Sequence, residues 1–293
     1  MAPGRLELAN GDAVLTLAPE TGGGVAGLSW RGVELFRPAT RESLESNDPL
    51  GLGDFPLVPF AGRLTRGRFV FDGRSVALPP NLDGETDAIH GQGWRAPWRV
   101  AEADRTTARL VFDHAASDWP WHYRAEQTFV LEDQTLVHAL AVTNSSTRPM
   151  PAGLGLHPYF PRDADTRLEA EITGVYLSTE GPAAPLPAEW DWRGGRVITA
   201  FVDHQFAGWM GSARITWPSR NLSLSMSCDS VTPYLVVYAP TGRHHVCVEP
   251  VSHRLDAVNR SPGGAGEGMV VLAPGQTTRL SVRFAWEDLR IKR

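Results

Sequence analysis

The chain has 293 residues, of which 42% are hydrophobic and 21% are charged, a composition typical of a globular protein that buries a core without disulfides or metals. Its net charge of −5 comes from 28 basic and 33 acidic residues spread along the chain, so no basic stripe favours a nucleic acid or an anionic membrane as partner. A small neutral ligand fits this charge pattern better. The start of the chain lacks the apolar core of a secretion signal, and no run of 18 apolar residues could span a membrane. These features predict a cytoplasmic protein.

The predicted secondary structure is dominated by strands and turns. The 29 glycines and 23 prolines leave little uninterrupted sequence for long helices. Asn10-Gly11 predicts a first hairpin turn, and Asp72-Gly73 predicts a second, between strands at 69–71 and 75–78. Asp-Gly and Asn-Gly are typical of such turns because they readily adopt positive φ angles.

Further short strands are predicted along the rest of the chain, at 108–112, 124–131, 136–143, 213–217, 222–226, 234–238, 246–248 and 278–285. The strand at 136–143 has apolar residues on both faces, which predicts a strand covered on both sides. Residues 181–188 and 263–268 are predicted loops, and we find neither a repeat nor a linker. The pattern predicts an all-β protein forming a single domain over residues 1–293.

The two cysteines carry no sign of metal binding or catalysis. Cys228 and Cys247 lie in separate strand-like segments without a CxxC motif or a histidine at metal-site spacing. Disulfides are rare in the cytoplasm, so we expect two buried free thiols.

Nucleophile and metal motifs are absent from the sequence. There is no GxSxG segment and no HExxH segment, and the adjacent His244 and His245 would point to opposite faces of a strand. The sequence therefore favours acid–base chemistry by histidines and carboxylates.

Four segments combine a titratable residue with proline, glycine or aromatic neighbours, as rigid loops at the mouth of a β fold often do: residues 59–63, 89–94, 155–160 and 248–250. Each is weak evidence by itself. A single histidine in a β protein is more often a hydrogen-bonded structural residue than a catalyst, and Glu249 also fits a simple carboxylate at a strand end.

Taken together and in this order, the segments resemble the aldose 1-epimerase (galactose mutarotase-like) family over nearly the whole chain. The resemblance rests on five matches in sequence order: the Arg63 segment, His90-Gly91 followed by Trp94 and Trp98, Gly-x-His-Pro-Tyr-Phe at His157, Asp203-His204-Gln205-Phe206, and Glu249-Pro250 followed by Asp256-Ala257-Val258-Asn259.

This resemblance implies a super-sandwich of antiparallel sheets with an open sugar cleft, and a cofactor-free isomerase without a metal. It implies that His157 is the general acid and Glu249 the general base. His90 and Arg63 would hold the ring oxygen and hydroxyls, and Asp203 would bind a sugar hydroxyl. The chain departs from the family at Gly62, where an asparagine often precedes the arginine.

Two other functions remain compatible with the sequence. A hexose 6-phosphate 1-epimerase would need cations around the phosphate, for which the candidates are Arg66, Arg68, Arg95 and Arg99. A non-catalytic sugar-binding protein on the same scaffold would not need the acid–base pair. Galactose and glucose both fit as free sugars.

The tryptophans allow two interpretations. Their flat faces could stack on a sugar, or they could pack in the core, where large aromatics usually lie. The candidates are Trp94, Trp98, Trp119 and Trp121.

Overall fold

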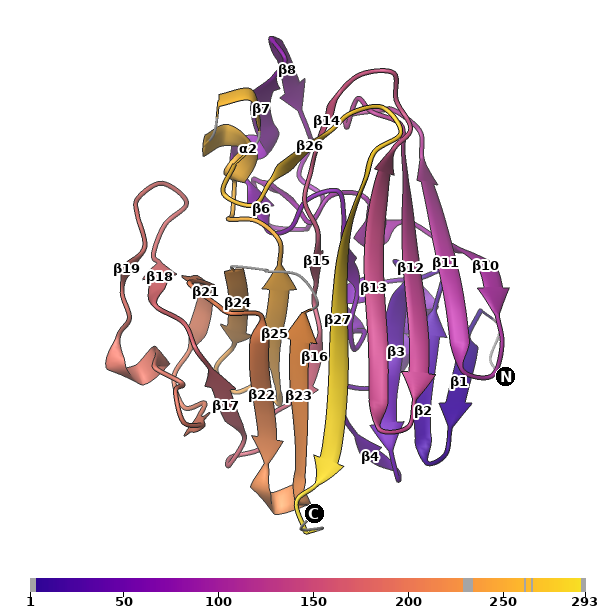
Figure 1. The fold of residues 1–293 in the computed structure, drawn as a ribbon, viewed down its shortest axis with the longest axis vertical. Helices are drawn as coiled ribbons and strands as arrows, with labels where there is room; N and C mark the ends of the chain where they lie inside the picture. The colour runs from indigo at the N-terminus through magenta and orange to yellow at the C-terminus, as the bar shows by residue number, and fades with distance from the viewer. Residues whose placement is uncertain (1–3, 229–233, 261, 265, 291–293) are drawn as a thin grey trace.

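Three antiparallel sheets make up most of the structure, a computed structural model that describes residues 4–228, 234–260, 262–264 and 266–290. The largest sheet has nine strands in the order β10 (Arg99–Ala103), β11 (Thr107–His114), β12 (Tyr123–Glu132), β13 (Thr135–Asn144), β27 (Thr277–Asp288), β23 (Leu222–Cys228), β22 (Ser212–Trp217), β17 (Arg167–Ala170) and β20 (Arg196–Val197). It runs across the front of the molecule in Figure 1.

Two further sheets lie behind this one (Figure 1). An eight-stranded sheet contains β19 (Ala184–Pro185), β18 (Gly174–Tyr176), β21 (Val202–Ala207), β24 (Tyr234–Ala239), β25 (His245–Val251), β15 (Gly155–Leu156) and β5 (Pro56–Leu57), with β16 (Tyr159–Pro161) also paired to β25. A four-stranded sheet contains β1 (Leu6–Asn10), β2 (Ala13–Ala18), β3 (Gly24–Trp30) and β4 (Val33–Glu34). The predicted antiparallel β super-sandwich is confirmed.

Short elements complete the fold. Three strand pairs stand apart from the large sheets: β6 (Arg63–Leu64) with β9 (Ala88–Ile89), β7 (Arg68–Phe71) with β8 (Arg74–Ala77), and β14 (Met150–Ala152) with β26 (Val270–Leu272). The described residues contain two short α-helices, α1 (Arg41–Ser46) and α2 (Ala257–Arg260). No helix in these segments is both long and apolar enough to cross a membrane.

Both predicted hairpins form where their turn residues require. Asp72 and Gly73 have φ angles of 50° and 70° and connect β7 to β8. Gly11 has a φ angle of 56° in the turn between β1 and β2. Positive φ at both central residues, as at Asp72 and Gly73, matches the right-handed twist of the flanking strands. In the first hairpin Asn10 is the last residue of β1 and pairs with Ala13, so the turn is formed by Gly11 and Asp12, of which only Gly11 has a positive φ.

Each of the other predicted strands lies within an observed strand, in β11, β12, β13, β22, β23, β24, β25 and β27. The prediction for 136–143 was wrong in one respect. Leu136, His138, Leu140 and Val142 are fully buried, whereas the other face is covered only in part, with Ala139 buried and Val137 and Ala141 half-buried. Among the described residues, the predicted loops at 181–188 and 263–268 contain the two-residue strand β19, the first residue of a 3₁₀ turn at Ala188–Trp190 and part of a 3₁₀ turn at Pro262–Gly264.

The core lies between the nine-stranded sheet and the two sheets behind it. Apolar residues of all three sheets join one cluster, including Leu15, Phe129, Leu140, Phe206 and Val248. Alternate strand residues point to this core because side chains alternate between the faces of a strand. Such aligned face-to-face packing of sheets is typical of β-sandwiches.

The prediction that both cysteines are buried is confirmed for Cys247 and is wrong for Cys228. Cys247 is a free thiol and fully buried. Cys228 is only half-buried, because it is the last residue of β23 and lies at the end of the strand rather than in its centre.

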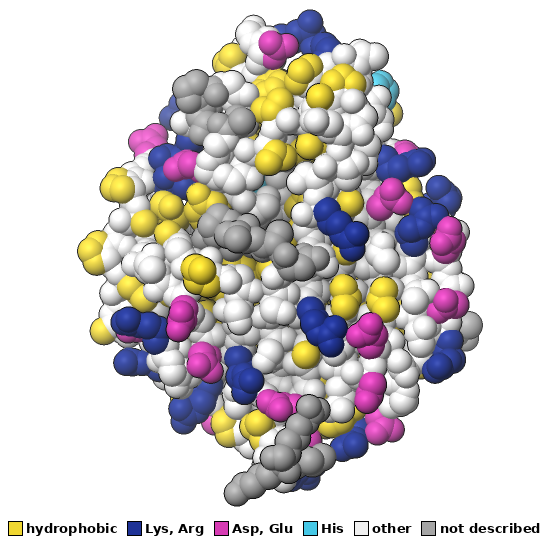
Figure 2. Space-filling model, viewed as in Figure 1, with side chains coloured by type: hydrophobic (Ala, Val, Ile, Leu, Met, Phe, Trp, Pro, Cys, Tyr) yellow, Lys and Arg dark blue, Asp and Glu magenta, His cyan; other side chains and the backbone are white. Residues whose placement is uncertain are grey.

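The charged residues on the face shown in Figure 2 are mixed in sign. Lys and Arg side chains alternate with Asp and Glu side chains over the nine-stranded sheet, without a continuous basic stripe on this face (Figure 2). This agrees with the even charge distribution in the sequence.

Candidate active site

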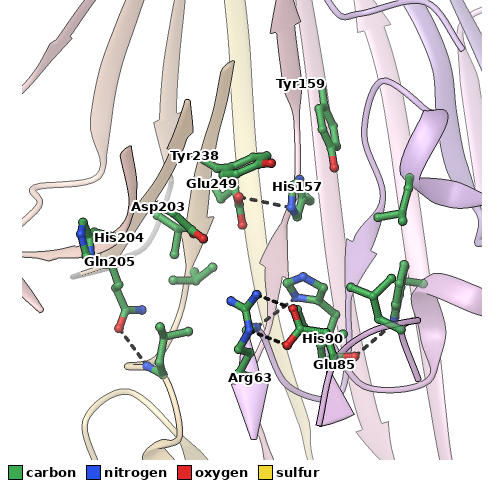
Figure 3. A pocket seen from close by; sticks show the side chains of 18 of the residues that line it. Arg63, Glu85, His90, His157, Tyr159, Asp203, His204, Gln205, Tyr238 and Glu249 are labelled. Atoms are coloured by element: carbon green, nitrogen blue, oxygen red, sulfur yellow. Dashed lines mark hydrogen bonds and ion pairs between the residues drawn. The ribbon is translucent and has the colours of Figure 1, made fainter. Parts of the chain in front are cut away.

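A pocket of about 580 Å³ opens on the eight-stranded sheet and is lined by all five predicted site residues (Figure 3). These residues are Arg63, His90, His157, Asp203 and Glu249. They come from β6, the turn after β9, the connection between β15 and β16, β21 and β25. The volume falls within the range of about 300 to 1,000 Å³ common for small-molecule sites.

The pocket floor follows from strand alternation. On β25, His245, Glu249 and Val251 line the pocket, whereas Val246 and Val248 between them belong to the core. Alternate residues point to the same face of a strand, so a strand whose other face is core presents every second side chain to the ligand.

Strand register sets which side chains meet across the floor. Tyr238 pairs with Asp203 on one side and with Cys247 on the other, and Cys247 pairs with Tyr159. One step along the strands, Gln205, Val236 and Glu249 form the next row. His157 lies two residues before Tyr159 and so stands beside Glu249.

His157 and Glu249 form the central pair of the pocket (Figure 3). The Nε2 atom of His157 lies 3.3 Å from Oε1 of Glu249, and the two side chains are 10% and 4% exposed. The His157 ring is stacked between Phe55 at 4.6 Å and Tyr159 at 4.7 Å between ring centroids. The imidazole is therefore held in place with one nitrogen directed at the carboxyl group.

Burial shifts both pKa values of this pair toward the neutral forms. The pKa of His157 is lowered to about 3, mainly by burial and in addition by the charges of Arg37 and His245. The pKa of Glu249 is raised well above its usual value, mainly by burial and then by Asp203 and Asp54. The positive charge of Arg63 lowers the pKa of Glu249, but it is the weakest of these causes. These shifts favour a neutral imidazole on His157 and a protonated carboxyl on Glu249, so that the pair carries one proton between the facing atoms.

His90 is held in a single tautomer by the chain segment before Arg63. The backbone N–H of Gly62 donates to Nδ1 of His90 at 3.0 Å, so the proton of the neutral ring is on Nε2. Burial, His157 and Arg63 lower the pKa of His90 well below its usual value. His90 itself has a positive φ of 61°, a strained backbone that often marks functional positions.

Gly62, the departure from the family pattern, has a structural reason. Its φ is +71°, and a Cβ atom there would lie 2.0 Å from a methyl carbon of Leu255. A side chain at position 62 would require Leu255 to move.

Arg63 is neutralised by a residue that the sequence analysis missed. Its guanidinium donates to both carboxylate oxygens of Glu85, at 3.2 and 2.8 Å (Figure 3). This bidentate pair raises the pKa of Arg63 and lowers that of Glu85. Glu85 lies in a loop without a motif, so no sequence signal identified it.

Behind the pocket, a buried network supports the backbone of His157. The N–H of His157 donates to Oδ1 of Asp54 at 3.0 Å, and Oδ2 of Asp54 lies 3.1 Å from Nδ1 of His138. The other nitrogen of His138 lies 2.9 Å from Oε1 of Gln127, and Nε2 of Gln127 donates to the Gly23 carbonyl. None of these residues was predicted to matter.

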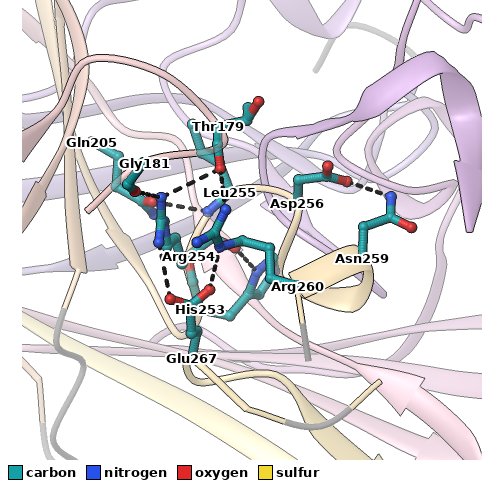
Figure 4. A network of polar contacts seen from close by, with 10 residues as sticks. All are labelled: Thr179, Gly181, Gln205, His253, Arg254, Leu255, Asp256, Asn259, Arg260 and Glu267. Atoms are coloured by element: carbon teal, nitrogen blue, oxygen red, sulfur yellow. Dashed lines mark hydrogen bonds and ion pairs between the residues drawn. The ribbon is translucent and has the colours of Figure 1, made fainter. Parts of the chain in front are cut away.

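A second network gives a structural role to Asp256 and Asn259, which belong to the last of the five segments that resemble the family (Figure 4). Asp256 accepts from the backbone of Thr65, two residues after Arg63, and from the Asn259 side chain. In the same turn, the backbone N–H of Leu255 donates to Gln205 of the pocket at 2.8 Å. These residues position the pocket wall rather than line the pocket themselves, except for Leu255 and Gln205.

Two arginines, the buried Arg254 and the half-buried Arg260, brace this wall from behind (Figure 4). Arg254 and Arg260 both donate to Glu267 and to the Thr179 carbonyl. Arg254 also packs over the ring of Tyr176 at 4.0 Å.

The structure places the candidate tryptophans in the core and the candidate phosphate-binding arginines outside the pocket. The four tryptophans are core residues with at most 3% exposure, and only Trp94 also lines the pocket. The arginines proposed for a phosphate were wrongly placed, since all four are exposed and none is among the pocket-lining residues that the structure describes: Arg66, Arg68, Arg95 and Arg99. Strand and turn geometry directs them to solvent.

The fold also brings together a group that no motif revealed. His157, Cys247 and Glu249 each offer a metal-ligand atom within 4.8 Å of the others. Burial raises the pKa of the Cys247 thiol well above its usual value, which disfavours the thiolate that a metal would need. The arrangement therefore suits proton transfer better than metal binding.

Comparison with known proteins agrees with this geometry. The family model described as aldose 1-epimerase matches residues 4–285. The chain belongs to the aldose 1-epimerase family. It is 32% identical to YphB of Escherichia coli K12, an uncharacterized protein, over 90% of this chain and 93% of YphB. It is 26% identical to YihR of the same organism, also uncharacterized, over 94% of this chain and 91% of YihR.

Solved structures of family members have the same fold. A candidate aldose 1-epimerase from Escherichia coli K12 matches with a TM-score of 0.89 and 32% identity, over 97% of this chain and 99% of the other. A galactose mutarotase-like protein from Clostridium acetobutylicum has a TM-score of 0.85 and 20% identity, over 96% and 94% of the two chains.

Proposed function

We propose that this family member is an active aldose 1-epimerase, which interconverts the α and β anomers of an aldose by opening and closing its ring. The observation that carries the proposal is the His157–Glu249 pair, whose facing atoms lie 3.3 Å apart in a pocket of sugar size. Acid–base catalysis requires one group that gives a proton and another that takes one, both within reach of the substrate.

The reaction needs only proton transfers. Glu249 takes the proton of the anomeric hydroxyl, the bond between C1 and the ring oxygen breaks, and its electron pair goes to the ring oxygen, which accepts a proton from His157. The open-chain aldehyde turns about the bond to C2, and closure reverses both transfers. Since burial favours the neutral forms of the free pair, the proposed mechanism requires that the proton on Glu249 moves to His157 when a sugar occupies the pocket.

The remaining predicted residues bind the sugar in this proposal. His90 donates from Nε2, because its Nδ1 already accepts from Gly62. Arg63, fixed by Glu85, donates to a hydroxyl, and Asp203 accepts from one.

The test is polarimetry of freshly dissolved α-D-glucose and α-D-galactose, with and without the protein and corrected for spontaneous mutarotation. Acceleration supports the proposal and ranks the two sugars. If the protein binds these sugars without accelerating their mutarotation, it is a sugar-binding protein and the proposal is wrong. A cytoplasmic location also remains a proposal, which cell fractionation would test.

A further inference from the structure

The two ends of the pocket differ in how their positive charge is compensated. At one end, Arg63 forms an ion pair with Glu85. At the other end, Arg37, Arg243 and His245 line the pocket, and none of the three has an ion-pair partner in the described part of the chain. The second end therefore carries uncompensated positive charge.

Arg37 is fixed in place without being neutralised. Its Nε and Nη2 atoms donate to the backbone carbonyls of Leu50 and Leu52, and its guanidinium packs over the Tyr159 ring at 3.8 Å. A side-chain hydrogen bond with Tyr159 also holds it, and no carboxylate among the described residues forms an ion pair with it. Carbonyl groups orient the guanidinium but leave its charge available to a ligand.

His245 reports the positive potential at this end. Its pKa is lowered to about 4, first by burial and then by the charges of Arg37, Arg243 and Arg162. A histidine kept neutral by its cationic neighbours donates or accepts a hydrogen bond without adding charge of its own.

This end lies close to the acid of the proposed mechanism. The Tyr159 ring is 4.7 Å from the His157 ring and 5.3 Å from the His245 ring, so one aromatic ring separates the proton donor from the cationic end. In a pyranose, the carbon that bears the exocyclic group is bonded to the ring oxygen. A sugar whose ring oxygen faces His157 thus has its exocyclic group near His157, and an orientation toward Tyr159 brings that group to the cations.

We infer that the substrate is an aldose with an anionic group, a phosphate ester or a carboxylate, on its exocyclic carbon, and that Arg37, Arg243 and His245 bind this group. The inference rests on the proposed function. Arginine suits both anions, because its planar guanidinium donates to two oxygens at once. The net charge of the chain favours a neutral ligand, but the charge next to the pocket decides which ligand binds there. We therefore expect an anionic sugar instead of a neutral one.

The experiment compares kcat/KM for anomer interconversion of glucose, glucose 6-phosphate and glucuronate by the wild-type protein and by Arg243→Gln. Arg243 is exposed, so this substitution leaves the packing intact. We expect wild type to favour at least one anionic sugar over glucose by roughly tenfold, as charge-assisted hydrogen bonds allow. Arg243→Gln should remove most of that preference, because it lowers kcat/KM for the anionic sugars by a larger factor than kcat/KM for glucose. The phosphate and carboxylate arms show which anion is preferred.

The matched control is Arg95→Gln, an exposed arginine that does not line this pocket. It should leave all three values unchanged, which separates a local effect from a change of net charge. Faster turnover of glucose than of both anionic sugars, or equal losses for all three sugars in Arg243→Gln, would overturn the inference and leave the proposed function intact. No acceleration with any of the three sugars would overturn both.

Discussion

Two histidine–carboxylate pairs lie near each other in this protein and have opposite properties. His138 and Asp54 are 3.1 Å apart with side chains 1% and 0% exposed, and both nitrogens of His138 have partners. His157 and Glu249 are 3.3 Å apart and face the pocket, and the buried Nδ1 of His157 has no hydrogen bond to another residue in the described part of the chain. A fully bonded pair stabilises the fold, whereas an incompletely bonded pair at a pocket can exchange protons with a ligand.

The two pairs are also joined. Asp54 bonds the His138 ring with one oxygen and the His157 backbone with the other. The His138–Asp54 pair thus positions the pair that we propose to be reactive, and substitutions in each pair should produce different losses.

The largest expected effect is on turnover by the reactive pair. Glu249→Gln and His157→Ala should each lower kcat by about 10² to 10⁴, because each removes a positioned acid or base. Polarimetry would measure the loss, and urea unfolding should show that both variants remain folded. The exposed Glu102→Gln serves as the control. A variant that keeps at least half of the wild-type rate would exclude that residue from the mechanism.

The structural pair should show the opposite pattern. His138→Ala leaves the buried Asp54 carboxylate without its partner, which should cost about 3 to 5 kcal/mol of the free energy of unfolding. Urea unfolding followed by tryptophan fluorescence would measure it. The folded fraction should lose far less turnover than Glu249→Gln does. An unchanged unfolding midpoint would contradict the structural role.

Stability should decrease as the pH falls from about 6.5 toward 4. The pKa values of His245 and His253 are lowered to about 4, chiefly by burial, so the unfolded state binds more protons in this window. The stability that these neutral rings provide is present above the unfolded pKa and is lost toward the folded one. Thermal unfolding across this range measures the slope, and His253→Gln should reduce it. A slope that this variant leaves unchanged would contradict the assignment.

The smallest expected effect is a shift of the basic limb of the pH–rate profile in Asp54→Asn. The Asp54 charge contributes to the raised pKa of Glu249, so its removal should lower that pKa. The pair would then lose its shared proton at a lower pH, and the basic limb would move to lower pH. Rates measured across the alkaline range would show the shift. A limb that stays in place would mean that Asp54 acts on His157 through position alone.

Sequence reasoning identified the residues of the pocket that belong to recognisable local segments. His90 and His157 lie beside glycine, proline and aromatic residues that hold short turns, and Glu249 precedes a proline. Asp54, His138 and Glu85 were missed because no local pattern marks them. Asp54 contacts residues 84 and 103 positions away in the sequence, and such contacts leave no trace in the spacing of either segment.

The sequence by itself determined the all-β class, the hairpins and most strands, because residue alternation and turn preferences act over a few neighbouring residues. It also determined the family, through five ordered segments. Only the tertiary structure decided that the predicted acid and base face each other, which arginines line the pocket and where positive charge remains uncompensated. Burial and pairing depend on strands far apart in the chain, and these long-range contacts set the charge and proton affinity of each group.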